Sequence, residues 1–386
     1  MYSKALKACL ILAMACLTLT PSCRKDTAQP PAVPLTEQEI LDKVLKLPAT
    51  PYNYANIHLP HYISSLGMDM IDNTPADNPI TDAGATLGRV LFYDKLLSAN
   101  NTTACASCHR QANSFSDPAP FSKGFSNVHT TRNSMTLVNS RYYETGRFLW
   151  DERANTLEEQ VLLPIEDAIE MGMTPYEMER RLGKEDHYKI LFKRAFGDTV
   201  ITRRKVALAL AQFVRSLVSV QSRFDEGKAG PETNLGEFVR FTEQENKGMR
   251  LYQNHCGHCH GTPVHIASAP RNNGLDLVYA DNGVGDITHN PADNGKFKTP
   301  SLRNVAVTAP YMHDGRFADL MEVIDFYSEG VQNHPNLDPS MREVGPGGQP
   351  IRLNFTQAQK EDLLVFLKTF TDEQFLRDVK YSDPFR

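Results

Sequence analysis

Two short segments of this chain share the pattern Cys-x-x-Cys-His. They consist of Cys105, Cys108 and His109, and of Cys256, Cys259 and His260. In such a motif both thiols can bond to the vinyl groups of a porphyrin, and the histidine that follows is placed to ligate the iron. The pattern therefore predicts two covalently attached c-type haems, one in each half of the chain.

A redox or zinc pair is the alternative interpretation of each Cys-x-x-Cys. A zinc site would need four ligands brought together, and both histidines would then be incidental. The other three of the seven cysteines, Cys9, Cys16 and Cys23, lie near the N-terminus, so none is left for a structural disulfide. These counts favour haem, and they leave His258, inside the second motif, as a spacer.

The ligand on the far side of each iron decides what such a protein does. A second strong ligand makes an electron carrier, whereas an open position allows peroxide or oxygen to bind. The two motifs alone leave both alternatives open.

The N-terminus has the features of an export signal. Lys4 and Lys7 precede the apolar stretch 8–20, which is shorter than the roughly 20 residues that span a bilayer as a helix. We expect residues 1–23 to be a signal peptide and the mature protein to occupy the periplasm or cell envelope.

Cys23 is a candidate lipid anchor. It follows a small residue and precedes a polar, proline-rich stretch, as in bacterial lipoproteins, and residues 24–35 are predicted to be a linker. Thr20 and Pro21 fit the usual lipoprotein signal poorly, so ordinary signal cleavage nearby is the alternative.

The elements that position the motifs are predicted to be helices. Capping boxes predict helix starts at Thr36 with Glu39, at Thr242 with Glu245, and at Thr356 with Gln359. The first box opens an apolar-periodic run over 36–47, and residues 203–222 are a further helix rich in Ala, Leu and Val. Residues 223–237, rich in glycine and charge, are the predicted domain boundary.

Composition sets the fold class more broadly. The chain has 386 residues, of which 41% are hydrophobic and 23% charged, which suits about two globular domains. A net charge of -5 gives no reason to expect nucleic acid as a partner. Strand signals are sparse, so we expect a mainly α protein with long irregular loops.

The chain resembles the bacterial di-haem cytochrome c peroxidases and the related MauG proteins. The resemblance runs from about Ala83 to Leu367 and rests on four blocks, LGRVLFYDKLLSAN, RNSMTLVN, FLWDERANTLEEQ and KTPSLRNVAVTAPYMHDGRF. It implies two cytochrome c-like haem domains packed together, here 36–230 and 231–386. Peroxide would react at the N-terminal haem, and the C-terminal haem would receive electrons.

The resemblance assigns roles around the first haem. Trp150, the single tryptophan, matches a residue that transfers electrons between the haems; a core aromatic is the alternative. Glu170 matches a glutamate that moves a proton between the peroxide oxygens, although a solvated surface carboxylate is the alternative. Gln160 and Pro164 match other positions of the peroxide pocket.

Phe125 stands where many of these peroxidases have a histidine that blocks the first haem until activation. The substitution favours an open site, as in MauG proteins. His129, which follows shortly after, is the alternative blocking ligand.

Tyr327 stands where the peroxidases have a methionine ligand to the second haem and MauG proteins have a tyrosine. An anionic oxygen ligand would lower the haem's reduction potential, whereas a thioether would raise it. Met312, Met321 and Met341 are the alternative ligands.

The resemblance also implies a calcium ion between the haems. Asn133, Thr308 and Pro310 match its ligands, and hard oxygen donors suit calcium. Family members are often dimers, which allows a homodimer here.

Three functions follow as hypotheses. The first is a peroxidase that reduces hydrogen peroxide with electrons from a donor such as a small cytochrome or cupredoxin. The second is MauG-like oxidation of residues on a partner protein. The third is a di-haem electron carrier or redox sensor without turnover.

Overall fold

Helices joined by long irregular segments make up the chain, as expected for a mainly α protein. The computed structural model describes residues 34–65, 71–261, 269–345 and 347–386, and within these ranges only isolated bridges between single residues occur in place of strands. The predicted signal peptide 1–23, with Cys23, and most of the linker 24–35 lie outside the described residues. In the described ranges, no helix is both long and apolar enough to cross a membrane.

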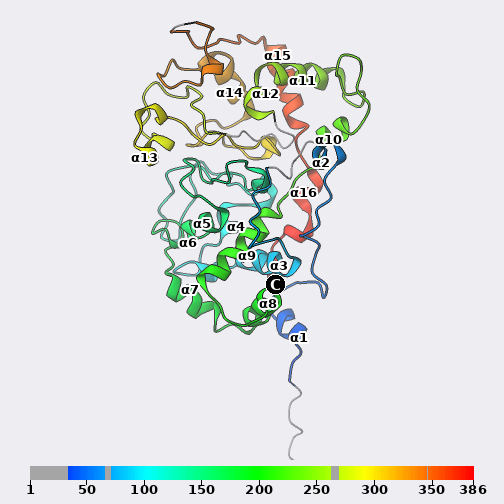
Figure 1. The fold of residues 1–386 in the computed structure, drawn as a ribbon, viewed down its shortest axis with the longest axis vertical. Coiled ribbons are helices and arrows are strands. Elements are labelled where there is room, and N and C mark those ends of the chain that lie inside the picture. Colours follow the sequence, from blue (N-terminus) through cyan, green and yellow to red (C-terminus); the bar gives the residue numbers. More distant parts are fainter. Residues whose placement is uncertain (1–33, 66–70, 262–268, 346) are drawn as a thin grey trace, which may run out of the picture. The chain divides into compact units, whose positions relative to one another are not determined.

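Sixteen α-helices occur in the described ranges (Figure 1). They are α1 Glu37–Asp42, α2 His61–Ser64, α3 Asp82–Tyr93, α4 Cys105–Cys108, α5 Leu157–Gln160, α6 Leu163–Glu166, α7 Pro175–Leu182, α8 Asp186–Phe196, α9 Arg203–Arg215, α10 Arg223–Lys228, α11 Glu243–His255, α12 Gly257–His260, α13 Val284–Thr288, α14 Leu320–Asp325, α15 Gln357–Lys368 and α16 Glu373–Arg377.

Helices α3 and α9 cross at close range and form the frame of the first core. A Cβ atom on Gly88 of α3 would lie 2.0 Å from the carbonyl oxygen of Ala209 on α9, so only glycine permits this approach. Phe92 and Phe213 are buried beside the crossing, with ring centroids 5.2 Å apart. This pair supports α4, which carries the first haem motif and packs against α3.

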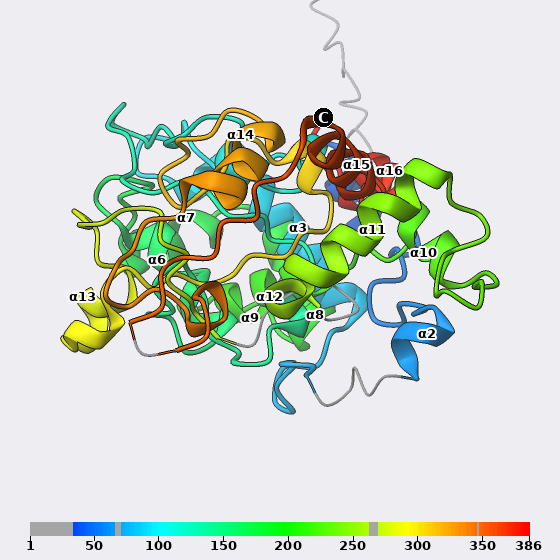
Figure 2. The same ribbon diagram turned by 90° about the horizontal axis from the view of Figure 1, so that it is seen from above.

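Helices α11 and α15 form the matching frame in the second half, and Figures 1 and 2 show them side by side. Both begin with the predicted capping boxes. A Cβ on Gly248 of α11 would lie 2.0 Å from the carbonyl oxygen of Asp362 on α15. Helix α12, with the second haem motif, follows α11 directly, so this crossing positions the second motif.

Two predicted helices are shorter than the sequence suggested. The helix predicted over 36–47 ends at Asp42, because Leu45 instead pairs with Phe385 at the C-terminal end. The helix predicted over 203–222 ends at Arg215, and the residues that follow continue through the core in a non-helical conformation. In both cases contacts distant in sequence override a local helical pattern.

The C-terminal segment returns to the first core. Phe375 and Tyr381 belong to the same buried cluster as α3 and α9, and the Tyr381 hydroxyl donates to the carbonyl of Ser216 at 2.8 Å. Residues 37–386 form one compact unit. The division at 230/231 therefore stays a prediction, and the turn-rich segment 223–237 contains helix α10.

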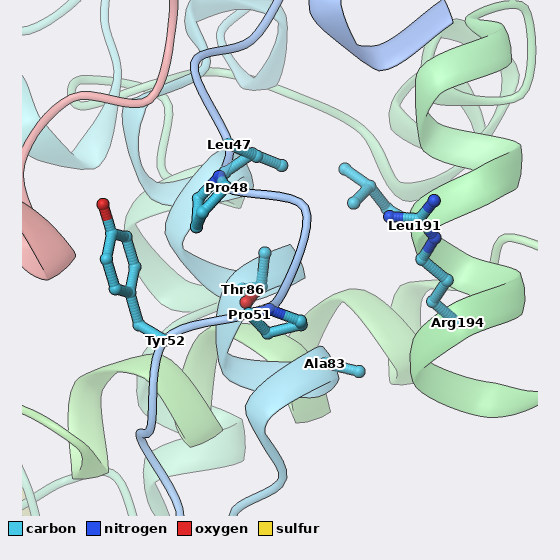
Figure 3. Close-up of a pocket in the computed structure, with 8 residues that line it drawn as sticks. All are labelled: Leu47, Pro48, Pro51, Tyr52, Ala83, Thr86, Leu191 and Arg194. Atoms are coloured by element: carbon cyan, nitrogen blue, oxygen red, sulfur yellow. The ribbon is translucent and has the colours of Figure 1, made fainter. Parts of the chain in front are cut away.

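A small hollow lies between the segment 47–52 and helices α3 and α8 (Figure 3). Leu47, Pro48 and Tyr52 line it from the segment, and Leu191 and Arg194 line it from α8. Its volume of about 20 Å³ has room for about one water molecule. This hollow is too small to bind a substrate or cofactor.

Candidate haem sites

The first cysteine pair faces a small cavity of about 50 Å³. Helix α4 contributes the cysteines, α3 and α9 contribute apolar side chains, and α5 and α6 contribute Gln160 and Pro164. The predicted site residues that line it are Cys105, Cys108, His109, Gln160, Pro164 and Glu170. The fold thus brings the first motif together with every predicted peroxide-pocket residue.

His109 is oriented by a backbone hydrogen bond. Its Nδ1–H donates to the carbonyl oxygen of Phe115 at 2.8 Å. Ser114 and Phe115 both have positive φ angles, of 56° and 57°, in the tight loop that presents this carbonyl. Burial lowers the pKa of His109 and favours the neutral ring. With Nδ1 protonated, Nε2 keeps the lone pair that iron requires.

Glu170 is half-buried at this cavity, which argues against a freely solvated carboxylate. Burial raises the pKa of Glu170 to about 7; the negative charge of Asp167 adds to the increase, and the positive charge of Arg153 opposes it. A carboxyl group with this pKa can both accept and release a proton near neutral pH. The position suits the acid–base role predicted for it.

The second cysteine pair faces a much larger cavity of about 530 Å³. Pockets that hold cofactors are commonly between about 300 and 1,000 Å³, so the second cavity has room for a haem, whereas the first would have to widen to admit one. The cavity is lined by the complete second motif, Cys256, Cys259 and His260, and by the predicted residues Trp150, Tyr327, Asn133, Thr308 and Pro310. His258 and His313 also lie on its wall.

Tyr327 lies on a π-helical turn, Phe326–Gly330, that continues helix α14. Such turns are frequent at functional sites because they shift the side chains of one turn. Burial raises the pKa of Tyr327 to about 12, and the amide of Asn273, which donates to the phenol oxygen at 3.1 Å, opposes this increase. Of the alternative ligands, Met312 and Met341 line the cavity and Met321 does not.

Trp150 belongs to the first half of the chain but lines the cavity of the second. Its indole N–H donates to the carbonyl oxygen of Asn133 at 2.8 Å, and its own carbonyl accepts from the backbone N–H of Lys298 at 2.7 Å. These bonds fix the ring between the two halves. Trp150 also packs against the buried cluster that includes Phe297, so its electron-transfer role stays a prediction.

The donor atoms at both sites fit haem c rather than zinc. None of the four motif cysteines is joined in a disulfide, and each pair is followed by a histidine that lines the same cavity. Within the described parts of the chain, no three His, Cys, Asp or Glu side chains are grouped as a metal site would need. Each motif therefore has the ligands for a covalently bound haem, and the described residues around it are not grouped as the four ligands of a structural zinc site.

Comparison with known proteins agrees with this chemistry. Residues 82–233 match the family model of the di-haem cytochrome c peroxidases. The chain is 31% identical to the methylamine utilization protein MauG of Methylophilus methylotrophus, over 76% of this chain and 84% of that protein. It is 30% identical to the cytochrome-c peroxidase IdrP1 of a Pseudomonas species, over 79% of this chain and 85% of that protein.

This protein belongs to the di-haem cytochrome c peroxidase family. A solved structure agrees: a MauG-like protein associated with microbial copper homeostasis is 34% identical, with a TM-score of 0.72 over 85% of this chain and 99% of that one. The similarity thus includes both haem sites of this family member.

At the position where the resemblance places a blocking histidine, this chain has Phe125. The ring of Phe125 packs so closely on Gly172 that a Cβ there would lie 2.5 Å from it, and the Phe125 N–H donates to the carbonyl of Glu170. His129 is exposed and does not line the first cavity. Among the described residues, His109 is the only histidine on that cavity's wall.

The three predicted calcium ligands of this family member, Asn133, Thr308 and Pro310, belong to the lining of the second cavity. The side-chain amide of Asn133 donates to the carbonyls of Ala119 and Pro120, at 3.1 and 3.3 Å. The fold brings these residues together, and the ion itself stays a prediction.

Two residues near the second haem of this peroxidase-family chain were missed by sequence reasoning. Asn273 hydrogen bonds to Tyr327, and no motif marks it. Lys298 opens the KTPSLRN block and is buried beside Trp150. A buried lysine cannot be told from an exposed one by residue type, so only its place in that block could have singled it out.

Proposed function

We propose that this protein is an envelope peroxidase that reduces hydrogen peroxide to two molecules of water, using two electrons and two protons. The observation behind the proposal is the pairing, in one cavity, of a histidine prepared to ligate iron with a carboxyl group whose pKa is about 7. An electron carrier needs the first of these and has no use for the second.

Protein side chains divide the work as follows. When bound at Cys105, Cys108 and His109, haem supplies the iron at which peroxide is held and reduced. Glu170 accepts the proton of the nearer peroxide oxygen and returns it to the departing one. Gln160 and Pro164 shape the pocket beside it. Trp150 conducts electrons from the second half of the molecule.

The supply of electrons and the location are parts of the same proposal. A small cytochrome or cupredoxin would deliver electrons to the second site, in the periplasm or cell envelope. Lipidation at Cys23 would tether the protein there. A calcium ion held through Asn133, Thr308 and Pro310 would stiffen the contact between the halves, and the homodimer allowed by the resemblance fits the same setting.

A turnover measurement tests the main proposal. The purified holoprotein is mixed with peroxide and a reduced small cytochrome, and oxidation of the cytochrome is followed. Wild type should turn over, Glu170→Gln should lose most of the rate, and Glu166→Gln should keep it, because Glu166 is exposed and pairs with Arg203. Equal rates in all three proteins would contradict the role of Glu170.

A second candidate function is MauG-like oxidation of residues on a partner protein. The observation in its favour is Tyr327, which lines the second cavity with Asn273 donating to its oxygen. As an oxygen ligand it would make this haem a poor acceptor of electrons from an ordinary donor. Peroxide consumption without any cytochrome oxidation, restored to ordinary turnover in Tyr327→Met, would favour this function.

The third hypothesis, an electron carrier or redox sensor, predicts two strong axial ligands at both irons. Electron paramagnetic resonance of the ferric holoprotein distinguishes it. A high-spin signal that disappears on adding peroxide excludes a simple carrier. Low-spin signals alone, unchanged by peroxide, would exclude the peroxidase instead.

A further inference from the structure

Lys298 is a buried cation that the proposed reaction does not yet use. Its side chain is 4% exposed, and its backbone N–H donates to the carbonyl of Trp150. Its ammonium group donates to the carbonyl of Arg147 and lies 3.6 Å from a carboxylate oxygen of Glu152. Burial lowers the pKa of Lys298 to about 8, so the group is still mostly charged at neutral pH.

The same ammonium group faces an aromatic ring. Its nitrogen lies 3.6 Å from the centroid of the Tyr143 ring, and Tyr143 is itself buried and packs edge-on against Phe148. Tyrosine and tryptophan are both oxidisable, so Lys298 stands between two competing sites. Its backbone N–H hydrogen bonds to one of them, Trp150, and its ammonium group lies over the ring of the other, Tyr143.

A cation in this position opposes removal of an electron from Tyr143. The ring's electron density attracts the cation, and a ring that has lost an electron would repel it, most strongly where water is excluded. Burial also raises the pKa of Tyr143, so the phenol keeps the proton that oxidation would have to release. Glu152, a neighbouring base, is held in an ion pair by the same lysine.

Trp150 has the opposite surroundings. Its indole N–H donates to the neutral carbonyl of Asn133, which is not basic enough to take the proton. An electron can therefore leave the indole and be replaced with no proton transfer.

We propose that Lys298 is a positioning residue that confines one-electron oxidation to Trp150 and keeps Tyr143 reduced. This rests on the proposed peroxidase function, in which peroxide is the oxidant and the external donor is the reductant. For each electron that Trp150 passes toward the Cys105 side, it regains one from the Cys256 side. Tyr143 loses neither an electron nor a proton.

Peptide mass spectrometry of Tyr143 tests this proposal. The holoprotein is treated with peroxide in the absence of a donor, and oxygen addition or cross-linking at Tyr143 is quantified. Lys298→Met, which keeps most of the aliphatic stem, should increase oxidised Tyr143 by about 30-fold, the factor set by a desolvated cation–π contact. Lys298→Arg, which keeps the charge, should resemble wild type.

Two further variants separate charge from folding. Lys298→Gln removes the charge but can still donate to the Arg147 carbonyl, so it replaces Lys298→Met if that variant does not fold. Lys298→Met should complete fewer turnovers before inactivation than wild type, because its Tyr143 is oxidised. Combining it with Tyr143→Phe should return that number to the wild-type value. A merely structural lysine would give loss of thermal stability without this rescue.

A second oxidant makes the test independent of peroxide chemistry. Flash photolysis of ruthenium tris-bipyridine with persulfate generates a one-electron oxidant, and the same Tyr143 peptide is measured. If wild type consumes no peroxide, the peroxidase proposal fails. The role of Lys298 still stands if Lys298→Met or Lys298→Gln shows increased oxidation of Tyr143 with the ruthenium oxidant. Equal Tyr143 oxidation in wild type and folded neutral variants, or an increase in Lys298→Arg, would overturn the role of Lys298.

Discussion

Replacing Glu170 with glutamine should slow the reaction with peroxide by at least about 100-fold, the lower end of what general acid–base catalysis contributes. Glutamine keeps the size of the side chain and its polarity but cannot carry a proton between the two oxygens. Glu170 lines the first cavity together with His109, so the loss should fall on the step at that site.

The pKa of Glu170 sets the pH profile. A carboxyl group with a pKa of about 7 is ionised to about 10% at pH 6 and about 90% at pH 8. Since the ionised form must accept the first proton, the rate should rise about tenfold between these values. In Glu170→Gln this rise should disappear.

Asp167→Asn is the matched control. The negative charge of Asp167 contributes to the raised pKa of Glu170, and its carboxylate also accepts the backbone N–H groups of Ile169 and Glu170. Asparagine keeps an oxygen for those bonds but removes the charge. The pH midpoint should therefore move below 7 while the rate at high pH is retained.

Stopped-flow mixing of holoprotein with peroxide, from pH 5.5 to 8.5, measures both effects. A Glu170→Gln rate within about threefold of wild type, with the same pH midpoint, would refute the acid–base reasoning. A midpoint unchanged in Asp167→Asn would show that the pH dependence belongs to another group.

Other substitutions test the second half and the fold. Trp150→Phe should leave the first reaction with peroxide unchanged and slow steady-state turnover by at least about tenfold, about 1.4 kcal/mol of barrier; an unchanged turnover would argue for a core role. Tyr327→Met should raise the reduction potential of the second haem in a spectroelectrochemical titration, and an identical potential and resonance spectrum would show that Tyr327 is not a ligand. Asp225→Asn should lower the free energy of unfolding by about 3–5 kcal/mol in a urea titration. The reason is that the fully buried Arg303 loses the carboxylate 2.6 Å away. A loss below about 1 kcal/mol would mean that other groups compensate the charge of Arg303.

The sequence by itself determined the chemistry that is local along the chain. A c-type haem site depends on residues within one helical turn, and a capping box joins residues three apart, so both motifs and the helix starts at Thr242 and Thr356 could be predicted directly. The family resemblance added Glu170, Trp150 and Tyr327, and the structure places each of them on a haem cavity.

Only the tertiary structure decided the electrostatics and the choice among candidates. The pKa of Glu170, the exposure of His129 and the exclusion of Met321 from the second cavity depend on which segments cover each residue. Lys298 and Tyr143 are far apart in sequence, yet the ammonium group of Lys298 lies over the ring of Tyr143, and both residues are buried. Burial and charge placement arise from such long-range packing, and no local pattern of residues encodes them.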